Sequence, residues 1–325
     1  MFLSLVSIVI PLIKSACTHL MKAVFLDADT LGDDIDLTPI RNAVSELRVF
    51  ATTSPEELES HLGDAELILT NKVVISAQAM AGRRAILVLA TGTNNIDLDA
   101  ARDKNIPVLN VENYGTASVA QHTLMLILAL AARLPLYQRD LAQGLWQQHP
   151  FFCMMNHKTT ELAAKHLVLV GSGNLGTAVA RLAEVFGMVV HFAARPGCAD
   201  DPRPTFDELL GIADVLSFHC PLTKQTRGLL NADRLQQIKP GCLVVNCARG
   251  GIIDEEAALV ALRAGRIGGL AADVLPVEPP CQGHAVLDAL GEGLNLIVTP
   301  HNAWTSPEAR QKIIELTAQN ILGLG

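Results

Sequence analysis

Short apolar runs alternate with helical stretches through the first third of the chain. The runs have the length and composition of buried strands and lie at residues 23–26, 67–69, 85–89 and 108–110. Strands separated by helices are typical of a parallel sheet. The pattern therefore predicts a small parallel α/β domain over about residues 21–110.

A second run of strands and helices follows a long apolar helix. Residues 118–132 are apolar nearly all round the helix, which predicts burial at a domain or subunit interface. Strand candidates then recur at residues 167–170, 188–193, 215–218, 243–246, 269–273 and 296–298, which predicts one doubly wound sheet. The last helix, residues 307–322, begins after the cap candidate Ser306 and could fold back on the first domain.

Glycines occupy the turn that opens the second pattern. Gly171, Gly173 and Gly176 form a G-x-G-x-x-G turn between the apolar run 167–170 and a helical pattern over residues 175–186. In such a turn the backbone approaches a pyrophosphate at the helix N-terminus. A glycine turn in an ordinary α/β domain is the alternative. The residues that we predict to hold a dinucleotide here are Gly171, Gly173, Asn174, Leu175 and Gly176.

The residue after the second strand bears on the type of dinucleotide. An acid about 20 positions beyond the glycines would bind the adenosine ribose and repel a 2′-phosphate. Ala194 stands there, and Arg195 follows it. Arg195 suits a 2′-phosphate, although a solvated loop arginine is an equally good interpretation. The sequence favours NADPH as the cofactor, or the use of both NADPH and NADH.

These patterns predict an α/β fold with two Rossmann-like or flavodoxin-like lobes of doubly wound parallel sheet and an active-site cleft between them. We assign residues 21–117 and 300–325 to a substrate (catalytic) domain and residues 118–299 to a dinucleotide-binding Rossmann domain. The 325 residues, 50% of them hydrophobic, are enough for two such cores. Two lobes suit a dehydrogenase that closes over its substrate.

The first 20 residues stand apart from these patterns. Residues 2–13 are apolar, but no basic segment precedes them, and Pro11 and Lys14 interrupt the stretch. Met21 opens the first strand. We interpret residues 1–20 as a non-native or dispensable extension; a cleaved or anchoring signal is the alternative.

Charge and cysteine content exclude several function classes. The formal net charge is −8 and no basic block stands out, which argues against nucleic acid or an anionic membrane as a partner. The seven cysteines form no C-x-x-C pair and favour reduced thiols in a cytoplasmic protein. We expect no metal site.

Three later strands are each followed by residues suited to the reduction of a 2-keto acid. Arg249 offers a fork for a carboxylate and its neighbouring carbonyl, Asp273 and Glu278 offer carboxylates, and His301 offers an imidazole. A glutamate bonded to the imidazole would orient it and favour its protonated form. Taken singly, each is as well explained as a surface or loop residue. Parallel strands, however, place all of them at one edge.

In order and content, segments 171–176, 218–223, 246–250, 273–279 and 300–301 resemble the D-isomer-specific 2-hydroxyacid dehydrogenases. The resemblance covers nearly everything from Met21 onward. It implies that Arg249 binds and polarises the keto acid, that His301 is the acid/base and that Glu278 pairs with His301. It also implies that Asp273 contacts the nicotinamide carboxamide. The further residues implied are His219, Cys220, Pro221, Cys247 and Ala248 at the cofactor, and the backbone of Thr91 and Gly92 at the substrate carboxylate.

Within that family, segments 91–97, 113–120 and 301–304 are similar to glycerate dehydrogenases, also called hydroxypyruvate reductases. Three positions depart from the usual pattern. Asn302 replaces an apolar residue, and Ala164 replaces a glycine before a strand, which we take as a matter of packing. Ala194 replaces the acid, which puts strict use of NAD in doubt.

The sequence therefore predicts an NAD(P)-dependent oxidoreductase that reduces hydroxypyruvate to D-glycerate, with glyoxylate as a second substrate. The apolar helix 118–132 and the family favour a homodimer. Trp146 and Trp304 have two interpretations: they border the pocket, or they pack in a core or interface. Packing is the better interpretation of both. The alternatives are a dehydrogenase of the same fold for another 2-keto acid, formate or phosphite, and a non-catalytic NAD(P)-sensing regulatory protein.

Overall fold

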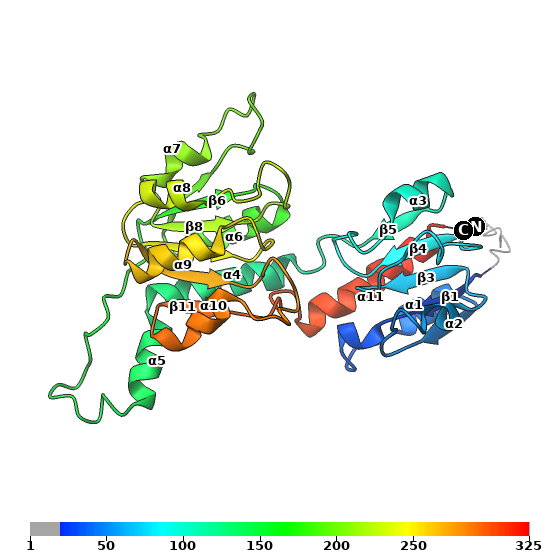
Figure 1. Cartoon of the computed structure of the whole chain (residues 1–325), viewed down its shortest axis with the longest axis horizontal. Coiled ribbons are helices and arrows are strands. Elements are labelled where there is room, and N and C mark those ends of the chain that lie inside the picture. Colours follow the sequence, from blue (N-terminus) through cyan, green and yellow to red (C-terminus); the bar gives the residue numbers. More distant parts are fainter. Residues whose placement is uncertain (1–19, 325) are drawn as a thin grey trace, which may run out of the picture. The chain divides into compact units, whose positions relative to one another are not determined.

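The chain divides into two compact units, each built on its own parallel sheet (Figure 1). The computed structural model describes residues 20–324. Within that range the first unit comprises residues 20–112 and 311–324, and the second comprises residues 113–310. The interpretation of residues 1–20 as an extension lies outside the described residues, apart from Leu20. Two parallel sheets covered by helices confirm the predicted α/β class.

The first unit is a five-stranded parallel sheet in the order β2-β1-β3-β4-β5. Its central strands β3 and β4 are buried along their whole length, which is why their apolar runs stand out in the sequence. The prediction missed β2, an edge strand that contains Glu46 and Arg48 and has no fully buried residue. The strands are β1 (Lys22–Phe25), β2 (Glu46–Val49), β3 (Leu67–Thr70), β4 (Ala85–Val88) and β5 (Val108–Asn110); the helices are α1 (Thr38–Ala43), α2 (Leu58–Leu62) and α3 (Leu98–Asp103), with a 3-10 turn at Ala28–Leu31.

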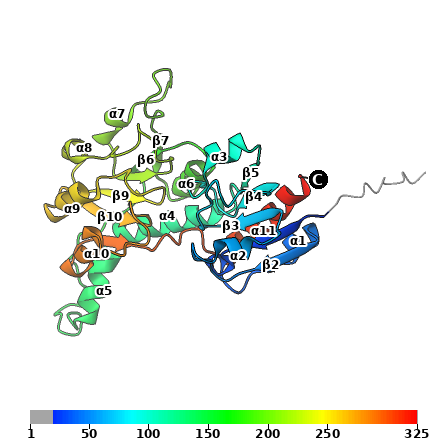
Figure 2. The ribbon, with the colours of Figure 1, turned by 45° about the vertical axis from the view of Figure 1, so that its right-hand side comes forward.

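The last helix, α11 (Pro307–Leu322), returns to the first unit. Asp36 N–H donates to Gln311 Oε1 at 3.0 Å, and Gln311 Nε2 donates to the Asp36 carbonyl at 3.1 Å. Farther along, Asn320 Nδ2 donates to the carbonyl of Asn110 at 3.0 Å. Figure 2 shows α11 beside the strands of this sheet. Ser306 Oγ accepts the N–H of Ala309 at 3.3 Å, so Ser306 caps the helix as predicted.

The second unit is a six-stranded parallel sheet in the order β11-β10-β9-β8-β6-β7. From β6 the chain moves to one side for β7 and to the other side for β8, so the strand order reverses at the ends of β6 and β8. Open α/β sheets bind ligands at such a point. The strands are β6 (His166–Val170), β7 (Val189–Phe192), β8 (Val215–Phe218), β9 (Cys242–Asn246), β10 (Ile267–Ala272) and β11 (Leu296–Val298); the helices are α4 (Thr116–Ala131), α5 (Leu134–Ala142), α6 (Asn174–Val185), α7 (Phe206–Leu210), α8 (Ala232–Gln237), α9 (Glu255–Arg263) and α10 (Ala285–Asp288), with a 3-10 turn at Ala289–Glu292.

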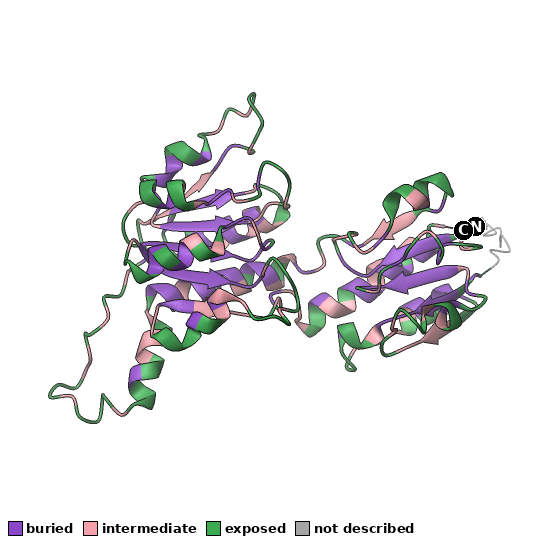
Figure 3. Cartoon of the chain, viewed as in Figure 1, coloured by how far each residue is buried: buried purple, intermediate pink, exposed green. Residues whose placement is uncertain are grey.

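Two hydrophobic clusters cover the two faces of this sheet. Alternate residues of β6 belong to different clusters: Leu167 packs with residues of α4 and α6, whereas Val168 packs with residues of α7, α8 and α9. Figure 3 shows the strands buried between helices whose outer surfaces are exposed. The apolar helix α4 is buried mainly by its own unit, because it packs on α6, β9 and β10.

The boundaries between the units differ by several residues from those that the sequence predicts. They fall at 112/113 and 310/311, whereas the predicted boundaries lie at 117/118 and 299/300. Residues 301–303 remain with the second unit because their N–H groups bond to Asp273, which follows β10. Asn113 likewise accepts a hydrogen bond from Asn174, at the start of α6.

The segment after α4 leaves the body of the second unit. α5 follows at a bend of 61°, and residues 143–159, which we call the arm, project from the unit beyond it (Figure 1). Within residues 20–324, no single helix is long and apolar enough to cross a membrane, and the bent pair of α4 and α5 passes that test by length and composition alone.

Ala164 shows why a glycine is usual before β6. Its φ is +60°, the left-handed region in which a Cβ atom costs about 1–2 kcal/mol. The departure is therefore a matter of backbone conformation rather than of packing. We expect Ala164→Gly to raise the free energy of unfolding by about 0.5–1 kcal/mol, since the relief of strain exceeds the added entropy of the unfolded chain.

Urea denaturation measures this change. The matched control is Gly265→Ala, because Gly265 has a φ of +69° and no described atom within 4 Å of the place where its Cβ would lie. That substitution should lower the free energy of unfolding by about 1 kcal/mol. A loss of stability in Ala164→Gly would contradict the account.

Candidate active site

The glycine turn after β6 has the geometry that a pyrophosphate needs. Gly171 has a φ of +110°, and a Cβ on it would lie 2.3 Å from the carbonyl oxygen of His219. A Cβ on Gly176 would lie 2.0 Å from the carbonyl oxygen of Gly171. A Cβ on Gly173, by contrast, would meet no described atom within 4 Å. Two glycines therefore permit close packing, and the third leaves open space for a ligand.

The start of α6 completes this cradle. Asn174 and Leu175 open the helix, and the N-cap residue Gly173 has no side chain to bond the first N–H groups. Unsatisfied N–H groups and the helix dipole favour an anion at this end. Asn174 is oriented by a hydrogen bond of 2.6 Å from its Nδ2 to Asn113 Oδ1. The turn and the helix thus fit the diphosphate of a nicotinamide dinucleotide.

The end of β8 lies directly against the glycine turn. His219 is held by a 2.9 Å hydrogen bond between its Nε2 and Ser217 Oγ, while its buried Nδ1 has no partner within residues 20–324. Burial lowers the pKa of His219 to about 4, so the ring is neutral at pH 7. Burial also raises the pKa of the Cys220 thiol to about 11 and that of the Cys247 thiol to about 12. Both thiols are protonated at neutral pH, so neither is an active nucleophile.

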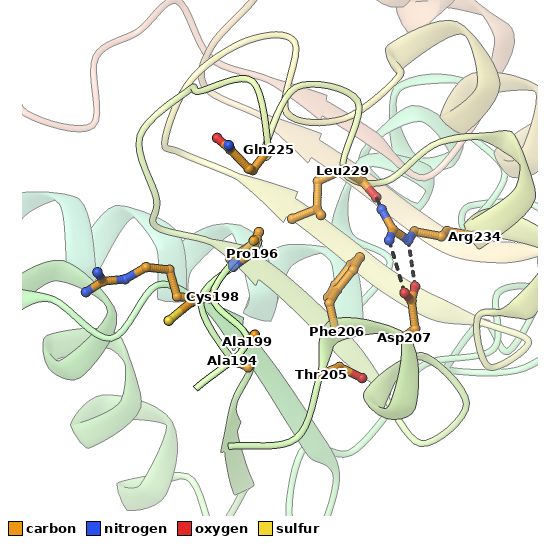
Figure 4. A pocket seen from close by; sticks show the side chains of 12 residues that line it. Ala194, Pro196, Cys198, Ala199, Thr205, Phe206, Asp207, Gln225, Leu229 and Arg234 are labelled. Carbon is orange, nitrogen blue, oxygen red and sulfur yellow. Dashed lines mark hydrogen bonds and ion pairs between the residues drawn. The ribbon is translucent and has the colours of Figure 1, made fainter. Parts of the chain in front are cut away.

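A pocket of about 470 Å³ lies at the end of β7. Ala194 and Arg195 line it, and their contact with a dinucleotide stays a prediction. Figure 4 shows the ion pair of Asp207 and Arg234 at one side of the pocket and Ala194 at the other. The residues that line it are Ala194, Arg195, Pro196, Gly197, Cys198, Ala199, Thr205, Phe206, Asp207, Gln225, Leu229 and Arg234.

The loop after β9 presents an exposed guanidinium. Asn246 shapes the loop: its Oδ1 accepts the N–H of Ala248 at 3.0 Å, and its Nδ2 donates to the carbonyl of Arg249 at 2.8 Å. Arg249 Nη1 donates to the carbonyl of Ala248 at 2.7 Å. Its other side-chain N–H groups have no partner within the described part of the chain. They face solvent and are available to an anion.

Gly250 joins this loop to the loop after β10. A Cβ on Gly250 would lie 2.0 Å from the carbonyl carbon of Leu275, so only glycine allows the two backbones to touch. The next residue, Gly251, donates its N–H to Glu255 Oε1 at 2.9 Å. The segment that carries Arg249 is therefore fixed against the segment that leads to Glu278.

Glu278 and His301 form the predicted pair. Glu278 Oε2 lies 2.6 Å from His301 Nδ1, and Glu278 Oε1 accepts the N–H of Leu275 at 2.8 Å. A carboxylate bonded to Nδ1 fixes the ring tautomer and leaves Nε2 to exchange a proton with a ligand. About one third of each side chain is exposed, so a ligand can reach the pair.

Asp273 holds the loop on which His301 lies. Its buried carboxylate accepts from Thr299 Oγ1 at 2.6 Å, from Asn302 N–H at 3.0 Å and from Ala303 N–H at 3.2 Å. Its carbonyl accepts the N–H of His301 at 2.7 Å. These bonds maintain His301 at a φ of +53°, which is rare for a residue other than glycine. Both carboxylate oxygens are engaged by the chain itself, so the contact with a nicotinamide carboxamide stays a prediction.

Thr91 and Gly92 belong to the first unit. They follow β4, where Asn110 Nδ2 donates to the carbonyl of Thr91 at 2.7 Å and Thr91 Oγ1 donates to the carbonyl of Val111 at 3.3 Å. The segment is thus fixed at the carboxyl edge of that sheet, which agrees with a ligand-binding role. Contact of its backbone with the substrate stays a prediction.

The two tryptophans lie in different surroundings. Trp304 packs against the cluster that contains α4, with Tyr114 edge-on at 6.2 Å between ring centroids. Trp146 is 52% exposed in the arm, where its Nε1 donates to the carbonyl of Phe152. Packing is therefore the better account of Trp304.

Several residues outside the predicted set also support the site. His122 of α4 has its Nε2 3.0 Å from Thr299 Oγ1 and 3.6 Å from Asp273 Oδ1. A histidine within an otherwise apolar helix was the available signal, since a buried polar group needs a partner. Glu255 was missed because nothing in its spacing points to Gly251.

Comparisons with known proteins agree with this arrangement. Residues 124–303 match the family model described as D-isomer specific 2-hydroxyacid dehydrogenase, NAD binding domain. The chain is similar to the glycerate dehydrogenase of Methylorubrum extorquens, with 34% identity over 92% of this chain and 95% of the relative. It is also similar to the hydroxypyruvate reductase of Blautia hydrogenotrophica, with 32% identity over 93% and 96% of the two chains.

A solved structure supports the same assignment. The D-lactate dehydrogenase of Aquifex aeolicus, complexed with NAD and lactic acid, superposes with a TM-score of 0.75 and 27% identity over 92% of this chain and 94% of that one. The family resemblance is thereby confirmed, and the protein is an oxidoreductase that uses a nicotinamide cofactor. The chain belongs to the D-isomer-specific 2-hydroxyacid dehydrogenase family.

Proposed function

We propose that this 2-hydroxyacid dehydrogenase reduces hydroxypyruvate to D-glycerate, with glyoxylate as a second substrate and NADPH as the preferred cofactor. The observation that carries the chemistry is the Glu278–His301 pair, on a loop system that also fixes the exposed guanidinium of Arg249. The glycerate-type segments 91–97 and 301–304 support the substrate, as do the names of two relatives. Ala194 and Arg195 at the pocket after β7 support the cofactor.

In this proposal Arg249 binds the anionic substrate. Its guanidinium holds the carboxylate and polarises the C2 carbonyl, while the backbone of Thr91 and Gly92 receives the carboxylate from the first unit. Because the chain carries a net charge of −8, attraction of an anion depends on such a local cation. Holding the carboxylate and the C2 carbonyl together aligns C2 before reduction.

His301 supplies the proton. When bound, the nicotinamide cofactor supplies a hydride to C2. Nε2 of protonated His301 donates its proton to the carbonyl oxygen, which becomes the hydroxyl of the product, and the ring regains a proton from water. Glu278 keeps Nδ1 protonated and stabilises the cationic ring, and Asp273 positions the loop.

Retention of this pair argues against the regulatory alternative. A protein that only senses NAD(P) needs the glycine turn and α6 but has no use for a proton donor. Arg249, Glu278 and His301 are all present at the carboxyl edge of the same sheet.

We also propose that the protein is a cytoplasmic homodimer. All six cysteines within the described residues are unpaired, as is usual in a reducing compartment. α5 and the arm expose large apolar side chains, among them Phe151 (67%), Phe152 (90%) and Met155 (81%). The arm is held by Tyr137, whose hydroxyl lies within hydrogen-bonding distance of the carbonyls of Met154 and His157 and donates its one proton between them. A fixed apolar surface of this kind suits a second copy of the chain.

Light scattering tests the dimer. We expect a mass of about twice 34.7 kDa for the wild type and a shift towards monomer in Phe152→Asp, since a carboxylate would be buried in the interface. Val185→Asp, at a residue of α6 that is 84% exposed, is the matched control and should remain a dimer. A monomeric wild type would refute the proposal.

Removal of the proton donor tests the mechanism. We expect His301→Ala to lower kcat about 10²–10⁴-fold, the usual contribution of general acid catalysis, while the Kd for NADPH stays within about twofold. Glu278→Gln keeps a hydrogen bond but loses the charge, so its kcat should fall by less than that of His301→Ala. Steady-state kinetics and NADPH fluorescence give the two quantities. Substantial residual turnover in His301→Ala would remove His301 from the mechanism.

A panel of substrates and cofactors tests the assignment. Oxidation of NADPH and NADH is followed with hydroxypyruvate, glyoxylate, pyruvate and 2-ketobutyrate, and we expect the highest kcat/KM with hydroxypyruvate and NADPH. Arg195→Gln should raise the KM for NADPH about tenfold through loss of a phosphate contact. Arg181→Gln removes an exposed charge on α6 and should change nothing. No activity across the panel would favour the regulatory alternative, and a strong preference for NADH would contradict the role of Arg195.

A further inference from the structure

An acid from later in the chain bonds to the backbone of Arg195, which lines the pocket after β7. Ala194 stands at the position where an acid is usual, so that position supplies no carboxylate. Asp201 Oδ2, however, accepts the N–H of Arg195, the next residue, at 2.8 Å. The Asp201 side chain is only 9% exposed. A half-buried carboxylate thus bonds to the backbone next to the position where a dinucleotide-binding chain carries its ribose-binding acid.

Arg203 neutralises this carboxylate. Arg203 Nε donates to Asp201 Oδ1 at 2.8 Å, Nη2 donates to Oδ2 at 2.5 Å, and the backbone N–H of Arg203 donates to Oδ1 at 3.2 Å. The pairing is bidentate, the strongest arrangement of these two groups. The Arg203 guanidinium, followed by the Arg195 N–H, holds the pKa of Asp201 well below its usual range, so the carboxylate is ionised and its charge is compensated.

Arg195 is then the uncompensated charge at the pocket. Asp207 is paired with Arg234 there, with Asp207 Oδ1 2.6 Å from Arg234 Nε (Figure 4). The guanidinium of Arg195 has no partner within residues 20–324, although its N–H bonds to Asp201. Asp207 and Arg234 therefore cancel, and Arg195 leaves one net positive charge on the pocket lining. Asp201 and Arg203 are not lining residues and compensate each other.

We propose that the Asp201–Arg203 pair determines the choice between NADPH and NADH, with Arg203 masking a carboxylate that would otherwise oppose the 2′-phosphate. Without Arg203, Asp201 would either repel the phosphate or draw the guanidinium of Arg195 to itself, and both lower the affinity for a 2′-phosphate. The inference rests on the proposed use of NADPH. Specificity for the cofactor then depends on Asp201 and Arg203 as well as on the absence of an acid at Ala194.

A purely structural role for the pair makes a different prediction. If Asp201 and Arg203 only fix the loop, loss of either residue should weaken every adenine nucleotide, and loss of both should be at least as harmful. If Arg203 masks a charge, its loss should weaken only nucleotides with a 2′-phosphate. Removal of the Asp201 charge should then repair the defect.

Two nucleotides that differ only in the 2′-phosphate separate these roles. Adenosine 2′,5′-bisphosphate and 5′-AMP are titrated by calorimetry into wild type, Arg203→Met, Asp201→Asn and the double variant Asp201→Asn/Arg203→Met. We expect Arg203→Met to bind the bisphosphate about tenfold more weakly and 5′-AMP unchanged, from the unmasking of one charge near the phosphate. The double variant should return to within about threefold of wild type.

Controls keep the result specific. Arg263→Met breaks a surface pair with Glu292 and should leave both affinities unchanged. Thermal melting checks that each variant is folded. An unchanged ratio of the two affinities in Arg203→Met, or a double variant as weak as the single one, overturns the masking role. Equal affinity of the wild type for the two nucleotides overturns the proposed use of NADPH itself, and this inference with it.

Discussion

The hydrogen bonds that the buried carboxylate of Asp273 accepts hold the rest of the site in place. A charge inside a protein is stable only when its oxygens are bonded, and here the donors come from residues 299–303, the loop that carries His301. The same residue therefore satisfies its own burial and fixes the imidazole relative to β10. This placement gives His301 an unusual, strained backbone angle, which only such a network can maintain.

In the proposed mechanism, one side chain at the carboxyl edge of the second sheet donates a proton and another binds an anion. His219 is neutral and the thiols of Cys220 and Cys247 stay protonated, because burial opposes their charged forms. The Glu278–His301 pair and Arg249 remain accessible to a ligand. Burial therefore separates side chains that keep one protonation state from side chains that a ligand can reach.

The sequence predicts those parts of the structure that depend on local pattern. Fully buried strands such as β3 and β9 are visible as apolar runs, whereas β2 is half-exposed and carries charges, so it was missed. The placement of Arg249, Glu278 and His301 could be predicted because parallel strands end at one edge. The role of Asp201 could not, since it depends on the path of a loop, and the contact of Gly250 with Leu275 depends on the packing of two loops.

In the proposed mechanism His301 and Arg249 act together on one bound 2-keto acid, which a crystal structure with the oxidised cofactor and D-glycerate would test. We expect His301 Nε2 within hydrogen-bonding distance of the C2 oxygen, and the Arg249 guanidinium on both that oxygen and the carboxylate. A bound D-glycerate whose C2 oxygen lies away from His301, or whose carboxylate makes no contact with Arg249, would contradict it.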